Sequence, residues 1–412
     1  MPKLPKFLEV KEDDTEEEKK KKRFLLILFI VLIVLLLAGG IVGIVLGAKS
    51  CSGSNSSSES STTSTTSETS SSESSSSESS STVTDFLVYE LNAGGDSYKV
   101  KGVKVGYPKD IVIPATHDGK PVTAIANYAF ENRDIKSVDM ADSVLSIGMC
   151  SFFNCSELES IHFSSNLQKT DNDAFYKCEK LTSVTIPSTL VDAAPDTFYK
   201  CTSLELLEHE NGKYLGNTVD PYIFLISAAN KDIASCQIAS GCRFIASDAF
   251  MECSSLATID IPSTVTKIGD SAFEKTGLTS VTIPSGVTYM GSDVFEDCGS
   301  LVTAIISDSV IEVGSSAFKN DVNLESVTLG KGLQGIRDAL FDECHKLASL
   351  TIPSNIEFID DFAFDGCDLL TALDYEGTMD DWNKIYFFEY WAEFSSLTVV
   401  HCTDGDVPVV LP

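Results

Sequence analysis

The sequence lacks the short motifs that mark common enzyme classes. It contains no G-x-S-x-G of serine hydrolases, no H-E-x-x-H of metalloproteases and no phosphate-binding loop. Its carboxylates do not pair in a recognisable catalytic frame either. We therefore expect no enzyme activity, no catalytic residue and no cofactor.

Metal ligands are equally scarce. No two cysteines stand in C-x-x-C spacing. The five histidines are scattered along the chain without the spacing of a ligand pair: His117, His162, His209, His345 and His401. Because structural zinc sites draw on closely spaced Cys and His pairs, we expect no metal site.

Basic residues are few. The chain has 30 Lys and Arg against 60 Asp and Glu, and its formal net charge is −30. Residues 84–412 alone carry a net charge near −28. Nucleic acids and anionic lipids bind cationic surfaces, so neither is an expected partner. Two interpretations of the acidic surface stay open: it keeps the domain soluble, or it captures a basic partner or divalent cations.

The first 47 residues have the features of a membrane anchor. A short charged tail, residues 1–23, ends in a basic run, and residues 24–47 contain no charge. As a helix, that apolar segment is long enough to span about 30 Å of hydrocarbon. The basic flank predicts a single-pass protein of the cell membrane, with a cytoplasmic N-terminus and the remainder outside. A cleaved signal peptide is the alternative. Glycines on one helical stripe allow weak self-association of this helix: Gly39, Gly43 and Gly47.

Residues 48–84 are Ser and Thr with isolated Glu and almost no apolar residue. Such a composition buries too little apolar surface to offset the entropy lost on ordering. The segment is therefore predicted to be a disordered stalk that holds the rest of the chain away from the membrane.

A phenylalanine then recurs at intervals of 22 or 23 residues, with one interval of 52: Phe130, Phe152, Phe175, Phe198, Phe250, Phe273, Phe295, Phe318, Phe341 and Phe364. A fixed period of this length predicts stacked repeats with a shared core. We assign residues 85–134 to an N-terminal cap and first repeat, 135–369 to repeats of about 23 residues, and 370–412 to a C-terminal cap. Ile233 starts a unit in register with Leu256, which leaves residues 204–232 as an insertion.

Each repeat reads L-x-x-V-x-I, then Pro or a small residue, then S-x-V-x-x-I-G-x-x-A-F-x-x-C. The alternation of V-x-I predicts a short strand with one face inward. The rest predicts a return side with a Gly at the bend and a short helical turn that carries Phe inward. Because a unit of this kind cannot bury its apolar face alone, the strands are expected to pair in parallel between repeats.

Cysteines recur at one position of the repeat: Cys155, Cys178, Cys201, Cys253, Cys298, Cys344 and Cys367. Thr276 and Asp321 stand in their place in two other units. Free Cys is among the residue types most often buried, so packing explains the period better than pairing does. Disulfides between neighbouring repeats stay an alternative.

The repeat resembles the BspA-type leucine-rich repeat family, for example in LTSVTIPSTL (181–190) and STVTKIGDSAF (263–273). The resemblance covers roughly residues 90–406. It implies a β-rich leucine-rich-repeat solenoid, and a surface protein that adheres to host or neighbouring-cell proteins through an extracellular or cell-surface protein partner. The family supplies no catalytic residues to carry over. The alternative function is a structural spacer of the cell envelope without a specific ligand.

Residues between the inward positions of each strand point outward and stack into a column. Its members are the candidate partner-binding residues: Asp139, His162, Thr185, Asp260, Thr282, Thr328, Thr351 and Asp374. Ile305 occupies the same position in one further repeat. A threonine ladder is also explained by strand propensity alone.

Two irregular segments have open interpretations. In the insertion, KYLG and YIFLI predict a β-hairpin that either packs on the solenoid or projects from it. In the C-terminal cap, Trp382 and Trp391 lie close to several Phe and Tyr residues. These aromatic residues either close the last repeat or form an exposed binding patch.

Overall fold

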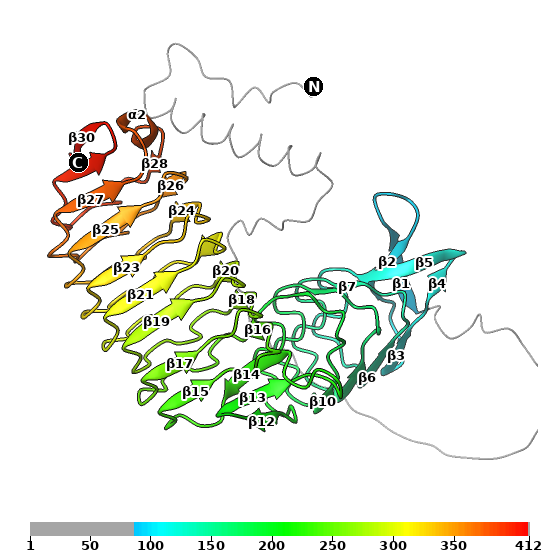
Figure 1. The fold of residues 1–412 in the computed structure, drawn as a ribbon. Coiled ribbons are helices and arrows are strands. Elements are labelled where there is room, and N and C mark those ends of the chain that lie inside the picture. The colour runs from blue at the N-terminus through cyan, green and yellow to red at the C-terminus, as the bar shows by residue number, and fades with distance from the viewer. Residues whose placement is uncertain (1–85, 411–412) are drawn as a thin grey trace, which may run out of the picture. The chain divides into compact units, whose positions relative to one another are not determined.

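The computed structural model describes residues 86–410, which wind into a β-solenoid whose successive turns stack on one another (Figure 1). Each regular repeat adds a strand to a front sheet, a two-residue strand to a second sheet, and a tight turn. The predicted tail 1–23, transmembrane helix 24–47 and stalk 48–84 lie outside the described residues. Among the residues described, no helix is long and apolar enough to span a bilayer.

The front strands pair in parallel and one repeat apart, so the prediction of parallel pairing is confirmed. Ser280 pairs with Thr303, and Thr303 pairs with Ser326. Buried and exposed residues alternate along these strands, as V-x-I predicts. The front strands are β3 (Asp110–Ile113), β6 (Ser137–Met140), β8 (Ser160–His162), β10 (Ser183–Val184), β15 (Ser235–Gln237), β17 (Thr258–Asp260), β19 (Ser280–Ile283), β21 (Thr303–Ile306), β23 (Ser326–Thr328), β25 (Ser349–Ile352), β27 (Ala372–Tyr375) and β29 (Val399–Cys402).

A second set of parallel strands runs along the return side and was not predicted. Most are two residues long, with the second residue buried; Ile268 pairs with Met290, for example. They are β5 (Lys120–Ile125), β7 (Ser146–Ile147), β9 (Lys169–Thr170), β11 (Asp192–Ala193), β16 (Phe244–Ile245), β18 (Lys267–Ile268), β20 (Tyr289–Met290), β22 (Glu312–Val313), β24 (Gly335–Ile336), β26 (Phe358–Ile359) and β28 (Tyr386–Phe387).

The expected helical turns on the return side are wrong. Around Phe273, Ser271 and Lys275 have φ angles of 51° and 58°, and the residues two places before and after Phe in most other repeats are also left-handed. Left-handed residues interrupt a right-handed helix. Alternate amide N–H groups bond between turns: that of Phe273 donates to the carbonyl oxygen of Val294 (2.9 Å) and that of Lys275 to the carbonyl oxygen of Glu296 (2.8 Å). The helix that the described residues do contain is α2 (Met379–Trp382), in the C-terminal cap.

Glycine at the bend is required by the close approach of neighbouring turns. A Cβ atom on Gly269 would lie 2.4 Å from the amide nitrogen of Ser247, and one on Gly314 would lie 2.4 Å from that of Ser292. No side chain fits at these distances. The repeated I-G therefore marks the positions where one turn rests directly on the backbone of the turn before it.

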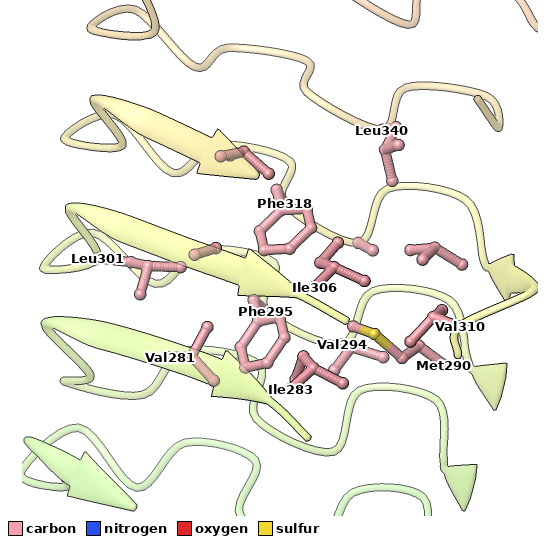
Figure 2. Packing of buried hydrophobic residues seen from close by; sticks show 14 of the residues in the cluster. Val281, Ile283, Met290, Val294, Phe295, Leu301, Ile306, Val310, Phe318 and Leu340 are labelled. Carbon is pink, nitrogen blue, oxygen red and sulfur yellow. The ribbon is translucent and has the colours of Figure 1, made fainter. Parts of the chain in front are cut away.

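Stacked phenylalanines form the centre of the core (Figure 2). Phe250, Phe273, Phe295, Phe318 and Phe364 are fully buried, as is Phe341. From Phe250 to Phe364 successive ring centroids lie 5.3–6.1 Å apart, with interplanar angles of 7–16°. Leu, Val and Ile from both sheets surround the column. The inward direction predicted for the Phe positions is confirmed.

The repeat cysteines are buried and free among the described residues. Most thiols donate to a carbonyl of the preceding turn: Cys298 Sγ lies 3.1 Å from the carbonyl oxygen of Phe273, and Cys344 Sγ lies 3.1 Å from that of Phe318. Burial raises the pKa of Cys298 to about 12. A thiol with such a pKa is a poor nucleophile at neutral pH, so these side chains serve as packing groups and weak donors.

The insertion forms a hairpin that joins the stack. Its strands are β12 (Leu207–His209), β13 (Gly212–Leu215) and β14 (Phe224–Ala228); they pair antiparallel, and β14 then pairs in parallel with β16. Ile223, Phe224 and Leu225 are fully buried. Phe224 belongs to the hydrophobic core on the N-terminal side and Leu225 to the core on the C-terminal side. The hairpin therefore links two cores and does not project.

Antiparallel strand pairs lie at both ends of the described chain. At the start, β1 (Leu87–Leu91) pairs with β2 (Tyr98–Val103), which pairs with β5; β4 (Thr116–His117) also pairs with β5. At the end, β29 pairs with β30 (Gly405–Pro408). Thr378 caps α2, accepting the amide N–H of Asp381, and Trp382 on α2 is buried. The last turn is thus closed by α2 and Trp382.

Candidate binding surface

All eight predicted site residues have exposed side chains on the front strands or next to them, but they do not form one continuous column. Asp139, His162 and Thr185 belong to the stack β3-β6-β8-β10, with Thr185 directly after β10. Asp260 lies on the separate pair β15-β17. Thr282, Thr328, Thr351 and Asp374 follow one another on the stack from β19 to β27.

Histidines lie beside two of the acidic residues of the column. Nδ1 of His162 lies 2.8 Å from Oδ1 of Asp139 on the adjacent strand. Asp374 pairs in register with His401, which the sequence reasoning did not include. A hydrogen bond to Asp406, with a smaller contribution from Asp374, raises the pKa of His401. The front face therefore carries an exposed histidine beside a carboxylate at two places, on β6 and β8 and on β27 and β29.

Strands β19, β21, β23 and β25 present a flat face without charge, which we name the hydroxyl face. On each of these strands the exposed residues are the first and the third. The face consists of Ser280, Thr282, Thr303, Ile305, Ser326, Thr328, Ser349 and Thr351. The sequence analysis found only one of its two columns, although the same alternation with period two predicts both.

Carboxylates gather where the insertion separates the two cores. Burial, with contributions from Asp173 and Asp270, raises the pKa of Asp196 to about 7. The hydroxyl of Tyr199 donates to the carboxylate of Asp248, which joins the turns on either side of the insertion. Within residues 86–410 no group of three or more His, Cys, Asp or Glu side chains is arranged to hold a metal ion. We therefore interpret this cluster as structural, linking the repeats on either side of the insertion.

Two hollows on the described surface are small. One of about 340 Å³ includes Glu90, Lys99 and Lys101, whose charges pair with one another at 2.8–2.9 Å. The other, of about 170 Å³, lies beside the hairpin and includes Val184 and Leu207. Neither is lined by His, by Cys or by a predicted site residue. The extended hydroxyl face is therefore the better candidate for a functional surface.

Stacked parallel strands, a shared column of buried Phe and a fixed period near 23 residues define a leucine-rich-repeat solenoid. The family model for the BspA type leucine rich repeat region matches in six copies, over residues 123–219, 218–348 and 311–400. The chain belongs to the BspA-type leucine-rich repeat family. No curated protein matches the sequence.

Solved structures of bacterial leucine-rich repeat proteins are similar to this chain. A leucine rich cell surface protein from Faecalibacterium prausnitzii is 22% identical, with coverage of 73% of this chain and 96% of its own and a TM-score of 0.34. A protein from Bacteroides ovatus is 19% identical, with coverage of 76% and 98% and a TM-score of 0.34. A protein from Eubacterium ventriosum is 18% identical, with coverage of 80% and 96% and a TM-score of 0.38. The family assignment rests on the family model and the repeat geometry.

Proposed function

We propose that the protein is a membrane-anchored cell-surface protein whose solenoid binds an extracellular or cell-surface protein, and that this binding serves adhesion to host or neighbouring cells. The observation that carries the proposal is the hydroxyl face. Its residues stand on hydrogen-bonded strands, are exposed and carry no charge. A protein partner can therefore be bound there without desolvating charged groups.

Family and sequence support the same function. Leucine-rich repeat solenoids use extended surfaces for protein recognition. The uncharged segment 24–47 and the Ser-rich segment 48–84 fit an anchor and a spacer that would place the solenoid outside the cell, with the N-terminus in the cytoplasm. Of the eight predicted contact residues, Thr282, Thr328 and Thr351 lie on the hydroxyl face, and the first column of the face extends them. The other five are proposed as contacts outside this face: Asp139, His162, Thr185, Asp260 and Asp374.

The binding proposal predicts loss of affinity when the middle of the hydroxyl face is charged. The double variant Thr328→Lys/Thr351→Lys places two ammonium groups there without touching the core, and should weaken binding at least about 10-fold because buried charges must then be desolvated. Purified full-length protein is tested by surface plasmon resonance against a panel of extracellular-matrix and cell-surface proteins.

The matched control is Asn154→Lys/Asn320→Lys on the turn side. Lys177, Lys200 and Lys275 already occupy that left-handed position in other repeats, so the control adds the same charge at tolerated sites. It should retain binding within about 2-fold, inside the range typical of contacts outside an interface. Equal binding by both double variants would exclude the hydroxyl face. Absence of saturable binding to every member of the panel would favour a structural spacer.

The membrane proposal predicts that protease added to intact cells releases the acidic repeat domain by cutting within residues 48–84. Because the composition of residues 48–84 predicts a disordered stalk, cutting there is expected to be faster than in the stacked solenoid. Release is followed by immunoblotting with antibodies against the C-terminus. Retention of full-length protein on intact cells, with cleavage after lysis, would contradict the outside orientation.

A further inference from the structure

The last two turns of the solenoid hold an unusual density of aromatic residues. Residues 353–400 contain 11 of the 37 aromatic residues of the chain. Some of them close the end of the core: Phe364, Tyr375 and Trp382 are buried. Six others are half-exposed or exposed, and we name them the aromatic strip: Phe358, Phe362, Tyr386, Phe388, Tyr390 and Phe394. Closure of the last turn does not account for the strip, since Phe394 is 72% and Tyr390 38% exposed.

Two adjacent chain segments form most of the strip. Residues 358–362 read FIDDF and residues 386–390 read YFFEY. They lie side by side, because Phe358 pairs with Tyr386, the amide of Phe388 donates to the carbonyl of Ile359 (3.0 Å), and the amide of Phe362 donates to the carbonyl of Tyr390 (3.0 Å). Rings meet within the strip: Phe362 stacks on Tyr390 with centroids 5.7 Å apart, and Tyr386 meets Phe388 edge-on at 4.9 Å.

Carboxylates are interleaved with these rings. Asp360, Asp361 and Glu389 stand between the aromatic residues of the two segments. Residues 353–400 as a whole carry eleven Asp and Glu against the single Lys384. Burial, together with Asp338 and Asp361 and against the opposing effect of Arg337, raises the pKa of Asp360 to about 6. The strip thus combines exposed and half-exposed rings with negative charge, and the two segments contain no Lys or Arg.

One guanidinium of the protein already binds at the edge of the strip. The Arg337 guanidinium carbon lies 4.9 Å from the Phe358 ring centroid, and its Nη2 donates to Oε1 of Glu312 at 2.9 Å. Glycine at position 335 makes room for that ring, since a Cβ there would lie 2.1 Å from Cζ of Phe358. A guanidinium held between a ring face and a carboxylate is therefore an arrangement that this surface supports.

We infer that the aromatic strip binds an arginine-rich segment of a partner protein, with guanidinium groups stacked on the ring faces and paired with the interleaved carboxylates. Arginine suits the strip better than lysine, because its planar, weakly hydrated group stacks on aromatic rings and pairs with carboxylates in a bidentate manner. The strip is separate from the hydroxyl face, because its segments lie on the return side, on β26 and β28 and in the turns that follow them. The inference does not depend on the proposed adhesion surface.

The test measures fluorescence anisotropy of labelled nona-arginine and nona-lysine peptides with the purified full-length protein, at about 50 mM and 300 mM NaCl. Exposed charge pairs are strongly screened at the higher salt, where the Debye length is below about 8 Å, whereas stacking contacts persist. Nona-arginine should bind at both salt concentrations and more tightly than nona-lysine at 300 mM. Nona-glutamate should not bind.

Variants that remove rings without changing charge test whether binding requires the aromatic strip or only an acidic surface. Tyr390→Ala/Phe394→Ala should weaken nona-arginine binding roughly 5- to 30-fold at 300 mM NaCl, as expected for the loss of two cation–π contacts. Phe394→Ala alone, at the most exposed ring, should weaken it by a smaller factor with little risk to folding. The matched apolar control Val191→Ala/Ile311→Ala truncates exposed side chains elsewhere and should leave affinity unchanged.

A second set of variants removes negative charge from the strip. Glu389→Gln/Glu393→Gln should weaken binding at both salt concentrations, and Glu252→Gln/Glu325→Gln, at exposed positions elsewhere, should not. Binding that is lost at 300 mM salt, equal for the arginine and lysine peptides, or insensitive to Tyr390→Ala/Phe394→Ala in a correctly folded variant would overturn the inference. So would the absence of nona-arginine binding at both salt concentrations.

Discussion

Replacement of Phe295 by alanine is expected to lower the free energy of unfolding by about 3–5 kcal/mol, the range measured for deletion of a buried aromatic side chain. Phe295 is fully buried and stacks on Phe273 and Phe318, each with centroids 5.4 Å apart. Its removal leaves a cavity between two turns whose backbones are fixed by hydrogen bonds on the turn side, so the neighbours cannot collapse into it. Both interfaces of this repeat are weakened together.

Urea unfolding followed by far-UV circular dichroism measures the loss, and amide hydrogen exchange locates it. Exchange should accelerate first in the repeats around residues 273–318. Thr282→Ala, on the outward face of the same repeat, is the matched control and should change stability by less than about 0.5 kcal/mol. A loss below about 1 kcal/mol for Phe295→Ala would mean that burial of the phenylalanine column contributes little to stability.

The parts of the fold that are predictable from the sequence are those with a long-range period. The spacing of Phe273, Phe295 and Phe318 predicts both the repeat length and the inward direction of these side chains. In a stack of repeats, a position that recurs every 22 or 23 residues packs against the equivalent position of the next repeat. Alternation in VTI at 281–283 likewise predicts which residues of β19 are exposed, and the structure agrees. These features follow from burial alone, so a single sequence contains them.

The second sheet and the left-handed turns could not be predicted in the same way. A two-residue strand such as β18 is too short to show a period, and its pairing depends on the turn above it. The left-handed positions around Phe273 are filled by Ser271 and Lys275, neither of which signals positive φ as glycine would. What holds them there is the hydrogen bonding between turns, which is absent from any isolated repeat.

The candidate binding surface was predictable residue by residue but not as a surface. Exposure of Thr282 and Thr328 follows from alternation, whereas the break in the column does not. The break between β10 and β15 lies at the insertion, whose strand β14 pairs with β16 in the second sheet and buries Phe224 and Leu225 in two different cores. From the sequence alone, YIFLI at 222–226 favoured packing against the solenoid but left a projecting hairpin open.

Asp321→Cys is expected to stabilise the solenoid at neutral pH. Asp321 stands at the repeat position of Cys298 and Cys344, is fully buried, and has no hydrogen-bond partner for either carboxyl oxygen. In the neighbouring repeats, cysteine at this position donates to a backbone carbonyl of the preceding turn, whereas neither carboxyl oxygen of Asp321 makes a hydrogen bond. Relieving an unsatisfied buried polar group is worth about 1–3 kcal/mol, and more where that group is charged.

The stabilisation by Asp321→Cys should depend on pH with a defined sign. Burial, with smaller contributions from Asp297 and Glu296, raises the pKa of Asp321 well above its ordinary value. The folded protein therefore keeps this proton over a pH range in which the unfolded chain, with an Asp pKa near 4, has released it. The stability of the natural protein consequently falls as pH rises from about 4 through the pKa of the folded state. The advantage of the cysteine variant should be smallest near pH 4 and largest above the folded-state pKa.

Urea unfolding of both proteins between pH 4 and pH 8 measures this advantage, since the difference cancels the titration of the other carboxylates. Asp321→Asn removes the charge but keeps a polar group of the same size. Its advantage over the natural protein should rise with pH as that of Asp321→Cys does. The gain in stability should be smaller than for Asp321→Cys, because the amide of Asn is also a buried polar group. Asp260→Asn removes one exposed carboxylate, and its free energy of unfolding should stay close to that of the natural protein at every pH. An advantage of Asp321→Cys that stays constant with pH would show that the side chain acts through its shape and that the buried carboxyl is not held protonated.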